Sequence, residues 1–351
     1  MDIGNALTVP IAPMEARLVD ALPEDDGWQF EPKWDGFRAI AVRRGDEAVI
    51  WSKSGKPLGR YFPELVALLL DVPERDFIVD GEIILPIAGA LSFGALQARL
   101  HPAASRIARL SRETPAQLMV FDILREDGRT LADESQAVRR EAVEDFHHGA
   151  GGPDLLLSPC STDVTQARAW LETAGGALDG VMMKRLDLPY LGGERAMAKI
   201  KQHRSADCVI GGFRTTPDGS GVASLLLGLY DDEGRLDHVG FTSGIAAAER
   251  VRLLKLLSPS IAAPGFTGKA PGGPSRWNNG KESAWSPLRP EMVVEILYDQ
   301  VTDGRFRHAT KLLRFRPDKR PDQCTRDQLV REISPAELIP LVEGKRPRRA
   351  R

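Results

Sequence analysis

The chain has 351 residues, 42% of them hydrophobic and 27% charged, which is typical of a globular protein large enough for two domains. The formal charge of −2 does not mark a nucleic-acid binder, and three widely spaced cysteines (Cys160, Cys208 and Cys324) argue against a disulfide framework or a zinc knuckle. No apolar run has the length of a membrane span and no secretory signal opens the chain, so we expect a cytoplasmic protein without membrane contact.

The most informative motif lies at residues 31–38, which read Glu-Pro-Lys-Trp-Asp-Gly-Phe-Arg. Its Asp-Gly pair predicts a short turn that holds Lys33 between strands at 28–32 and 38–42. A lysine held by rigid backbone suits a covalent nucleophile, provided that burial or neighbouring cations discharge its amine. The motif is weak by itself, and a solvated hairpin lysine is the open alternative.

Short strands and helices are mixed through the first half of the chain. Ser92 and Asp163 are residue types that cap helices, and we expect them to do so here. The apolar patterns predict strands at 38–42, 47–51, 77–85, 117–124, 179–184 and 197–201, and helices at 63–71, 92–100, 133–146 and 163–173.

Two of these predicted strands carry residues suited to binding a nucleotide. Asp80 and Glu82 share one strand face, and Glu82 could hold a ribose hydroxyl or a divalent cation unless this is a wet edge strand. Phe121 could stack on a purine, although a plain core position is the alternative.

The next two strands add a carboxylate and three lysines. Asp179 and Lys184 bracket a short apolar strand, which suits a metal ion and a phosphate respectively. Lys199 and Lys201 lie on one strand face, where like charges repel, so they favour an anion such as a triphosphate between them. They would also favour the uncharged form of a nearby lysine, as Lys33 requires.

From about residue 206 the sequence becomes mostly β. A helix at 246–257 interrupts strands at 207–214, 222–230, 236–242, 292–298 and 311–316. Five strands with one helix favour a small closed barrel of the OB type, although another small β-barrel remains open. Residues 262–287, rich in Gly, Pro, Ser and Asn, predict a surface loop.

The C-terminal third is basic. Such a stretch can neutralise backbone phosphates, or it can be a solvated charged face. Its cationic residues are Arg305, Arg307, His308, Lys311, Arg314, Arg316, Lys319 and Arg320, with Asp318 the only acid among them, and a basic tail follows at 345–351.

Competing motifs are missing. The sequence has neither a G-x-x-x-x-G-K-[ST] phosphate loop nor a G-x-G-x-x-G pattern after a strand, and no G-x-S-x-G elbow. The adjacent His147 and His148 do not have the spacing of metal ligands.

The order of these motifs resembles that of the covalent nucleotidyltransferases, specifically the ATP-dependent DNA ligases, and most closely the minimal two-domain bacterial LigC and LigD ligase-domain type. The resemblance runs from residues 10–14 to residues 317–320. It implies an α+β fold, with an antiparallel-sheet adenylation domain at 1–205 and an OB-fold barrel with a basic tail at 206–351. It also implies a bacterial, nucleoid-associated monomer that uses ATP and Mg²⁺ or Mn²⁺ to seal 5′-phosphate/3′-hydroxyl breaks in duplex DNA during repair. End-joining or repair proteins are further expected partners.

The resemblance also assigns roles by position. Lys33 would be adenylated, Glu31 would read the adenine amino group and Phe121 would stack on the base. Arg38 and Glu82 would contact the ribose or the nick, and Glu82 and Asp179 would hold metal. The remaining implied contacts are Lys184, Lys199 and Lys201 with the α-phosphate and its neighbours, Arg316, Asp318 and Lys319 with the leaving pyrophosphate, and Ser52, Lys53, Arg60, Arg305 and Arg307 with DNA.

Two residues depart from the family pattern. Asp179 stands where many ligases have Glu, and Lys53 stands where Arg is common, so bidentate phosphate contact is not expected there. Pyrophosphate must lie opposite Lys33 in the first step, whereas DNA must lie near the same pocket in the later steps. One fixed arrangement can hardly allow both, so we expect the barrel to swing about a hinge at 203–207. The alternatives are an RNA ligase, a GTP-using RNA capping enzyme, and a non-catalytic barrel that binds nucleic acid.

Overall fold

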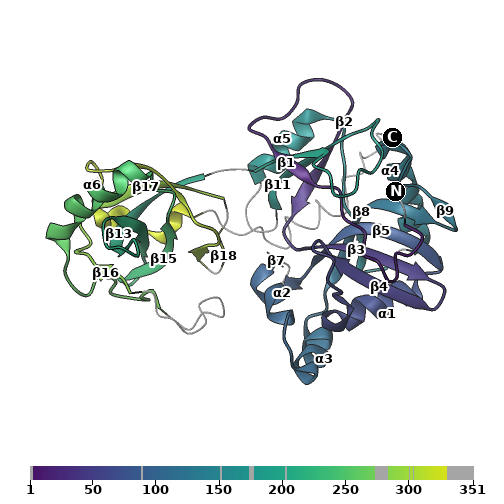
Figure 1. Ribbon diagram of the computed structural model, residues 1–351, viewed down its shortest axis with the longest axis horizontal. Coiled ribbons are helices and arrows are strands. Elements are labelled where there is room, and N and C mark those ends of the chain that lie inside the picture. Colours follow the sequence, from purple (N-terminus) through teal and green to yellow (C-terminus); the bar gives the residue numbers. More distant parts are fainter. Residues whose placement is uncertain are drawn as a thin grey trace, which may run out of the picture. The chain divides into compact units, whose positions relative to one another are not determined.

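The computed structural model describes residues 3–87, 90–150, 152–173, 178–201, 204–272, 284–299, 301–302 and 304–329. The chain divides into two compact units, residues 1–202 and 203–331, drawn in purple to teal and in green to yellow in Figure 1. The basic tail at 345–351, the middle of the predicted loop at 273–283 and residue 203 of the predicted hinge lie outside the described residues.

The first unit is built on two sheets. The first sheet has the order β1–β12–β11–β2, with β1 (Ala16–Leu18), β2 (Trp28–Trp34), β11 (Leu178–Arg185) and β12 (Met197–Ile200). The second has the order β10–β8–β5–β3–β4, with β9 beside β8; its strands are β3 (Phe37–Arg44), β4 (Glu47–Ser52), β5 (Asp76–Ile84), β8 (Gln117–Glu126), β9 (Arg129–Thr130) and β10 (Leu155–Leu157). Neighbouring strands are antiparallel except for the pairs β1–β12 and β10–β8.

Helices pack around these sheets, and most begin where the sequence predicts. Ser92 caps α2 by accepting a hydrogen bond from the backbone N–H of Ala95, and Asp163 accepts one from Thr165 at the start of α5. The sequence pattern did not predict α3, because Ile107 is the one buried residue in that helix. The remaining elements of this unit are η1 (Gly59–Tyr61), α1 (Pro63–Asp71), β6 (Pro86–Ile87), β7 (Ala90–Leu91), α2 (Phe93–Arg99), α3 (Ala104–Glu113), α4 (Gln136–Ala150) and α5 (Val164–Thr173).

The structure corrects the predicted position of Lys33, which lies inside β2 and not in a turn. The strands on either side of the Asp-Gly pair do not form a hairpin, because β2 pairs with β11 whereas β3 pairs with β4 and β5. Gly36 makes this passage between sheets possible, since a Cβ there would lie 2.1 Å from the carbonyl oxygen of Ile83. The nucleophile candidate therefore follows the geometry of a strand.

The second unit is a small barrel. Its five main strands have the order β15–β14–β13–β17–β20, and a bridge between Thr242 and Thr310 joins the end of β15 to the residue before β20. The sheet thereby closes on itself. Its elements are β13 (Arg204–Thr215), β14 (Val222–Tyr230), β15 (Leu236–Thr242), α6 (Ala247–Leu257), η2 (Ser258–Ser260), β16 (Ser286–Pro287), β17 (Val293–Tyr298), β18 (Val301–Thr302), β19 (Arg305–Phe306), β20 (Lys311–Phe315), η3 (Pro321–Gln323) and η4 (Arg326–Gln328).

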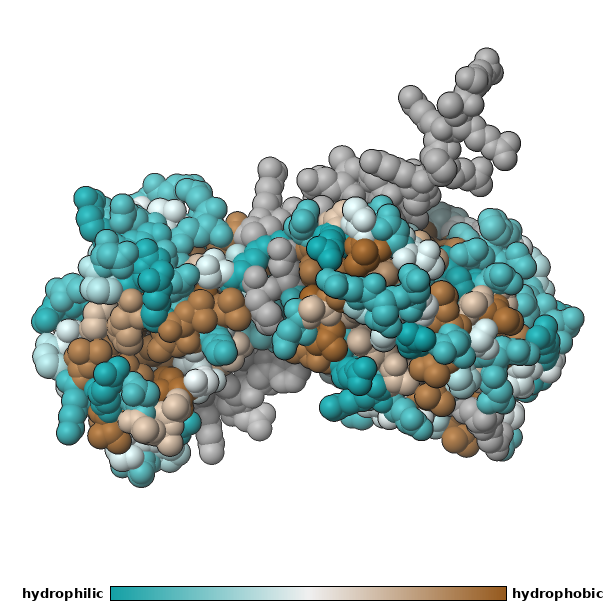
Figure 2. Space-filling view, turned by 90° about the horizontal axis from the view of Figure 1, so that it is seen from above, coloured by the Kyte–Doolittle hydropathy of each residue, from teal (hydrophilic) through white to brown (hydrophobic). Residues whose placement is uncertain are grey.

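Each unit has its own hydrophobic interior. In the barrel, one hydrophobic cluster extends from β13 to Cys324. It includes Phe213 and other buried residues of β13, β14 and β17. In the first unit, the largest cluster fills the space between α1 and the second sheet. Figure 2 shows hydrophilic residues over much of the visible face of both units, with apolar residues in smaller patches. Within the described residues, no helix is long and apolar enough to cross a membrane.

Candidate active site

Lys33 lies opposite a bulge that brings a carboxylate to it. In the pairing of β11 with β2, Leu178 faces Trp34 and Val181 faces Pro32, so two residues of β11 oppose Lys33 alone. The Nζ atom of Lys33 lies 2.6 Å from Asp179 Oδ2. Gly180 permits this bulge, because its φ is +135° and a Cβ there would lie 2.0 Å from the carbonyl oxygen of Ile200.

Two further lysines surround the same carboxylate. Lys201 Nζ lies 3.0 Å from Asp179 Oδ2, the oxygen that also contacts Lys33. Burial would raise the pKa of Asp179, but the charges of Lys33 and Lys201 lower it below its usual value. The pKa of Lys199 is lowered by burial and then by the charges of Lys33, Lys201 and Lys53. Lys199 and Lys201, which the sequence singled out as a pair, therefore do lie near Lys33.

Glu82 stands at the other side of this charge cluster. It lies directly opposite Arg38 in the pairing of β5 with β3. Burial raises the pKa of Glu82 to about 7, although the charges of Lys33 and Arg38 act to lower it. Glu82 therefore changes its charge near neutral pH, where a carboxyl group is normally ionised.

Glu31, Lys184 and Phe121 form a buried group on the neighbouring strands. Lys184 Nζ lies 2.8 Å from Glu31 Oε1 and donates a hydrogen bond to the carbonyl oxygen of Phe121. The Phe121 ring lies 4.8 Å from Lys184 Nζ and 4.6 Å from the guanidinium carbon of Arg38. A bulge in β8 at Phe121 aims this ring, since Asp80 pairs with Asp122 but Gly81 pairs with Val120. Lys184 thus lies beside Glu31, whereas the Lys33 group surrounds Asp179.

Two ion pairs with buried carboxylates lie on the strands that carry Glu82 and Phe121. Both oxygens of Asp80 accept hydrogen bonds of 2.6 Å from Arg38, and the hydroxyl of Tyr190 donates to Asp80 as well. Asp122 accepts hydrogen bonds from Arg139, whose side chain is fully buried in α4. Our sequence reasoning did not identify Tyr190 or Arg139. Asp122, which follows Phe121 on an apolar strand, could have indicated such a partner, because a buried carboxylate requires a cation or hydrogen-bond donors.

The donor set around Asp179 fits a divalent cation in part. Asp179 Oδ1 is buried and has no hydrogen-bond partner among the described residues, so one lone-pair face is available. The same residues contain no group of three or more His, Cys, Asp or Glu side chains that could hold a metal ion alone. A cation here would therefore depend on other oxygen ligands, such as those of a phosphate.

The predicted DNA-contacting residues of the first unit lie on its second sheet and the loops nearby. Ser52, at the end of β4, accepts a hydrogen bond from the backbone N–H of Lys56. The Nζ atom of the exposed Lys53 lies 3.2 Å from Glu15 Oε2, and the charge of Lys53 helps to lower the pKa of Lys199. Arg60 stacks on Tyr61 in η1. Of these three residues, Lys53 is the one whose charge acts on Lys199, and so on the lysines near Lys33.

In the barrel, the predicted pyrophosphate-binding residues gather on one acidic side chain. Asp207 in β13 accepts hydrogen bonds from Arg316 at 3.0 and 3.1 Å and from Lys319 at 2.7 Å. The opposite edge of the Arg316 guanidinium donates to Asp318. Asp207 itself is 9% exposed, and Gln328 bonds to both its backbone N–H and its carbonyl oxygen.

Two family models match this chain. The model described as the ATP dependent DNA ligase domain matches residues 13–201, and the model described as the ATP dependent DNA ligase C terminal region matches residues 218–319. The chain belongs to the ATP-dependent DNA ligases. The first model spans the sheets that carry Lys33, and the second spans most of the barrel.

Curated relatives agree with this assignment. DNA ligase C1 of Mycolicibacterium smegmatis is 46% identical over 331 residues, which cover 91% of this chain and 94% of the relative. DNA ligase C of Mycobacterium tuberculosis is 40% identical over 355 residues, covering 96% and 98% respectively. A solved structure described as "DNA binding with a minimal scaffold: Structure-function analysis of Lig E DNA ligases" has a TM-score of 0.54 at 16% identity, covering 87% of this chain and all of that one, which shows a common fold.

The predicted class and function are confirmed: this is an ATP-dependent DNA ligase of the LigC type, with an adenylation domain followed by an OB-like domain. The alternatives that the sequence left open, an RNA ligase, a capping enzyme and a non-catalytic barrel, give way to this assignment. The residue roles do not follow from the comparisons and require their own argument.

Proposed function

We propose that this ligase forms its covalent intermediate on Lys33, so that AMP is carried on the Nζ atom of that residue. The observation that supports this proposal is the convergence of Lys33 and Lys201 on a single oxygen of Asp179, with Lys199 nearby. Clustered cations attract a polyphosphate, and an amine among them can attack its phosphorus. Lys33 lies within β2, opposite the bulge of β11 that carries Asp179.

The contacts support a division of roles within the pocket. Glu31, Lys184 and Phe121 would bind the base, with Phe121 stacking on it and Glu31 accepting from its amino group. For Lys184, the contact with Glu31 favours the base side of the nucleotide over the α-phosphate predicted from the sequence. Arg38 and Glu82 would contact the ribose or the nick. Lys199 and Lys201 would contact the α-phosphate and its neighbours.

The proposed reaction has three transfers. Lys33 Nζ attacks the α-phosphorus of ATP, and the bond to the β-phosphate oxygen breaks as pyrophosphate leaves. The AMP group then passes to the 5′-phosphate at a DNA break, which frees the lysine amine. The adjacent 3′-hydroxyl attacks that phosphorus, forming the phosphodiester and releasing AMP. Each step spreads negative charge over phosphoryl oxygens, which the positioned lysines stabilise.

We propose that Asp179 and Glu82 hold Mg²⁺ or Mn²⁺ when it is bound. The buried and unpartnered Asp179 Oδ1 supports this role. The cation would supply positive charge to phosphate oxygens that the lysines do not reach. The bulge at Gly180 brings the carboxylate of Asp179, whose side chain is shorter than that of Glu, next to Lys33.

We further propose that residues 1–205 and 206–351 act as two domains, with a hinge at 203–207. Residues 204–207 form the start of β13. Arg316, Asp318 and Lys319 would orient the leaving pyrophosphate, and Asp207 supports this by holding both cations together. Ser52, Lys53, Arg60, Arg305 and Arg307 would contact the DNA. We expect a monomer in the bacterial cytoplasm near the nucleoid, acting with end-joining or repair proteins.

A single labelling experiment tests the proposed intermediate. The protein is incubated with ATP labelled on its α-phosphate and with MgCl₂, then denatured and separated by electrophoresis. We expect a label on the protein that is chased onto nicked duplex DNA when that DNA is added. Peptide mapping should place the AMP on Lys33, and a label on another residue would contradict the proposal.

A further inference from the structure

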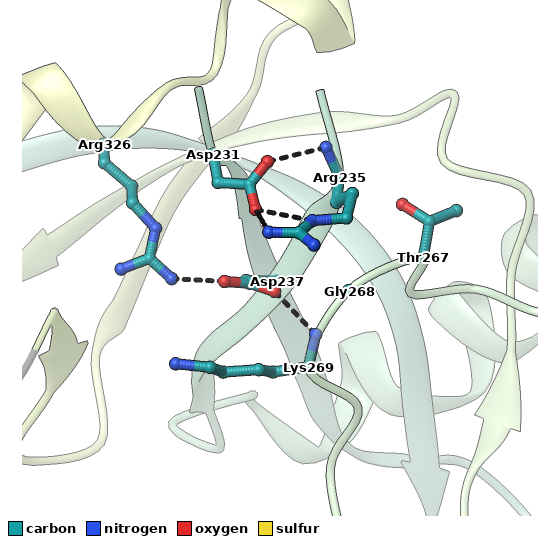
Figure 3. A pocket seen from close by; sticks show the side chains of 7 residues that line it. All are labelled: Asp231, Arg235, Asp237, Thr267, Gly268, Lys269 and Arg326. Carbon is teal, nitrogen blue, oxygen red and sulfur yellow. Dashed lines mark hydrogen bonds and ion pairs between the residues drawn. The ribbon is translucent and has the colours of Figure 1, made fainter. Parts of the chain in front are cut away.

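A polar pocket in the barrel is not used by the proposed chemistry. It has a volume of about 490 Å³, and it lies beside the turn that joins β14 to β15 (Figure 3). Its lining is Asp231, Arg235, Asp237, Thr267, Gly268, Lys269 and Arg326. This set contains no aromatic and no large apolar side chain, so the pocket offers no surface on which a nucleotide base could stack.

Some of these charges are already neutralised within the pocket. Asp231 accepts hydrogen bonds from the backbone N–H and the side chain of Arg235, and Arg235 also forms an ion pair with Glu233. Asp237, which is 6% exposed, accepts from the backbone N–H of Lys269 and from the side chain of Arg326, both at 2.6 Å. Figure 3 shows these contacts as dashed lines.

Three cations remain around the single carboxylate of Asp237. Lys269 bonds to Asp237 through its backbone only, and its Nζ atom makes no hydrogen bond or ion pair with the described residues. Arg326 has a buried Nε atom that lacks a partner among those residues. Arg305 lies close enough for the charge of Arg326 to lower its pKa, after the larger effect of burial.

Glu233, at the turn between β14 and β15, forms an ion pair with Arg235 and not with these three cations. Arg305 donates a hydrogen bond to Nδ1 of His238, a ring that is 5% exposed. Burial and then the charge of Arg305 lower the pKa of His238 to about 4, so this histidine is neutral at pH 7. Lys269, Arg305 and Arg326 thus carry three positive charges against the one negative charge of Asp237. With the turn residues Asp231, Glu233 and Arg235 included, the group has four positive and three negative charges, so a positive excess remains. Like charges that are brought together from distant parts of the chain favour a bound anion.

We propose that this pocket binds a backbone phosphate of the DNA substrate. Lys269 and Arg326 would donate to its oxygens, with Asp237 holding both residues in place. A phosphodiester fits better than a free nucleotide, because the pocket has cations but no surface for a base. Arg305, already expected from the sequence to contact DNA, extends the same positive surface along β19. This inference rests on the proposed function only in taking a DNA break as the substrate.

Lys269→Gln tests this inference in the full-length protein. The probe is a fluorescent nicked duplex with a dideoxy 3′ end, and its binding is measured by anisotropy without ATP at several salt concentrations. We expect the dissociation constant to rise about threefold or more, and the slope of log K against log salt to fall by about one, because one phosphate contact is lost. Lys269→Arg should restore both values. Unchanged binding and slope in Lys269→Gln would overturn the proposal.

Lys255→Gln is the matched control, because Lys255 is an exposed lysine in the last turn of α6 and does not line the pocket. An equal change in both glutamine variants would indicate nonspecific attraction and overturn the assignment. Removal of the AMP label by added pyrophosphate forms a second arm. If Lys269→Gln slows this removal and leaves DNA binding intact, the pocket binds pyrophosphate and the DNA assignment is wrong. Labelling of the wild-type protein, measured in the same preparation, tests the Lys33 proposal separately.

Discussion

The two units hold their candidate nucleotide-binding cations in different ways. In the first unit, the Lys184–Glu31 pair is almost completely buried, with both side chains 3% exposed. In the barrel, Arg316 is 19% exposed and its partner Asp318 is 62% exposed. Buried pairs have a fixed geometry and are little affected by salt, whereas exposed pairs are screened and can exchange partners. The first arrangement suits a base that is held at one defined position, and the second suits a phosphate group that must be bound and then released.

The largest expected effect in this comparison comes from Lys33→Ala. It removes the nucleophile, so we expect no AMP label on the protein. Some sealing of a DNA nick that already carries AMP on its 5′-phosphate should remain, because that step does not require a lysine adduct. Gel-based labelling and sealing assays measure the two reactions. Lys56→Ala, at an exposed lysine of the same unit, should behave like the wild-type protein.

A smaller but still large effect is expected from the double variant Arg316→Gln, Lys319→Gln. Loss of positioned donors to a developing anion typically costs about 10²-fold or more in rate, and we expect a loss of that order in label formation. Sealing of the pre-adenylated nick should suffer much less, because no pyrophosphate leaves in that step. Arg320→Gln, whose side chain bonds to Asp322, is the control. Equal losses in both reactions would argue against a role specific to the first transfer.

Asp207→Asn examines whether the barrel cations require a partner of their own. The variant retains the backbone bonds to Gln328 but weakens the charge-assisted bonds to Arg316 and Lys319. Such bonds contribute about 1.5–3 kcal/mol each, so we expect label formation to slow by about tenfold. Rapid-quench labelling over a range of ATP concentrations measures it. A faster rate in the variant would mean that Asp207 competes with pyrophosphate for these cations.

The mildest predicted effect concerns pH in the buried site. The pKa of Glu82 is raised to about 7, so its carboxyl group gains a proton as the pH falls through neutrality. An ionised carboxylate is the form that binds a metal ion or accepts from a ribose hydroxyl. We therefore expect label formation to fall several-fold between pH 8 and pH 6. In Glu82→Gln this acid limb should disappear from the pH profile, and its persistence would assign it to another group.

Most secondary structure could be predicted from the sequence, because apolar periodicity and caps are local. The predicted bounds of α1, β14 and β15 agree with the structure, and Ser92 caps its helix as expected. The position of Lys33 was predicted less well. An Asp-Gly pair normally makes a hairpin, but here the chain crosses from one sheet to the other, and only the close approach of Gly36 to β5 explains the difference.

The site was predictable in its charges but not in its pairings. Strand alternation places Asp80 and Glu82 on one face, whereas the bulges at Phe121 and Asp179 depend on register between strands far apart in the sequence. Asp207 was missed for the same reason, since its partners lie 109 and 112 residues along the chain. Spacing within a strand is a local property, and these contacts are not.

Gly36 and Gly180 have a consequence for how this ligase tolerates change. Neither residue carries a reactive group, yet a methyl group at either position would overlap a main-chain oxygen of the adjacent strand, at 2.1 and 2.0 Å. Even the smallest side chain would push apart strands that hold the lysine and the acid in register. Mutational scans should therefore find these two positions as intolerant as the charged ones, and alanine there should inactivate a protein whose polar groups are all still present.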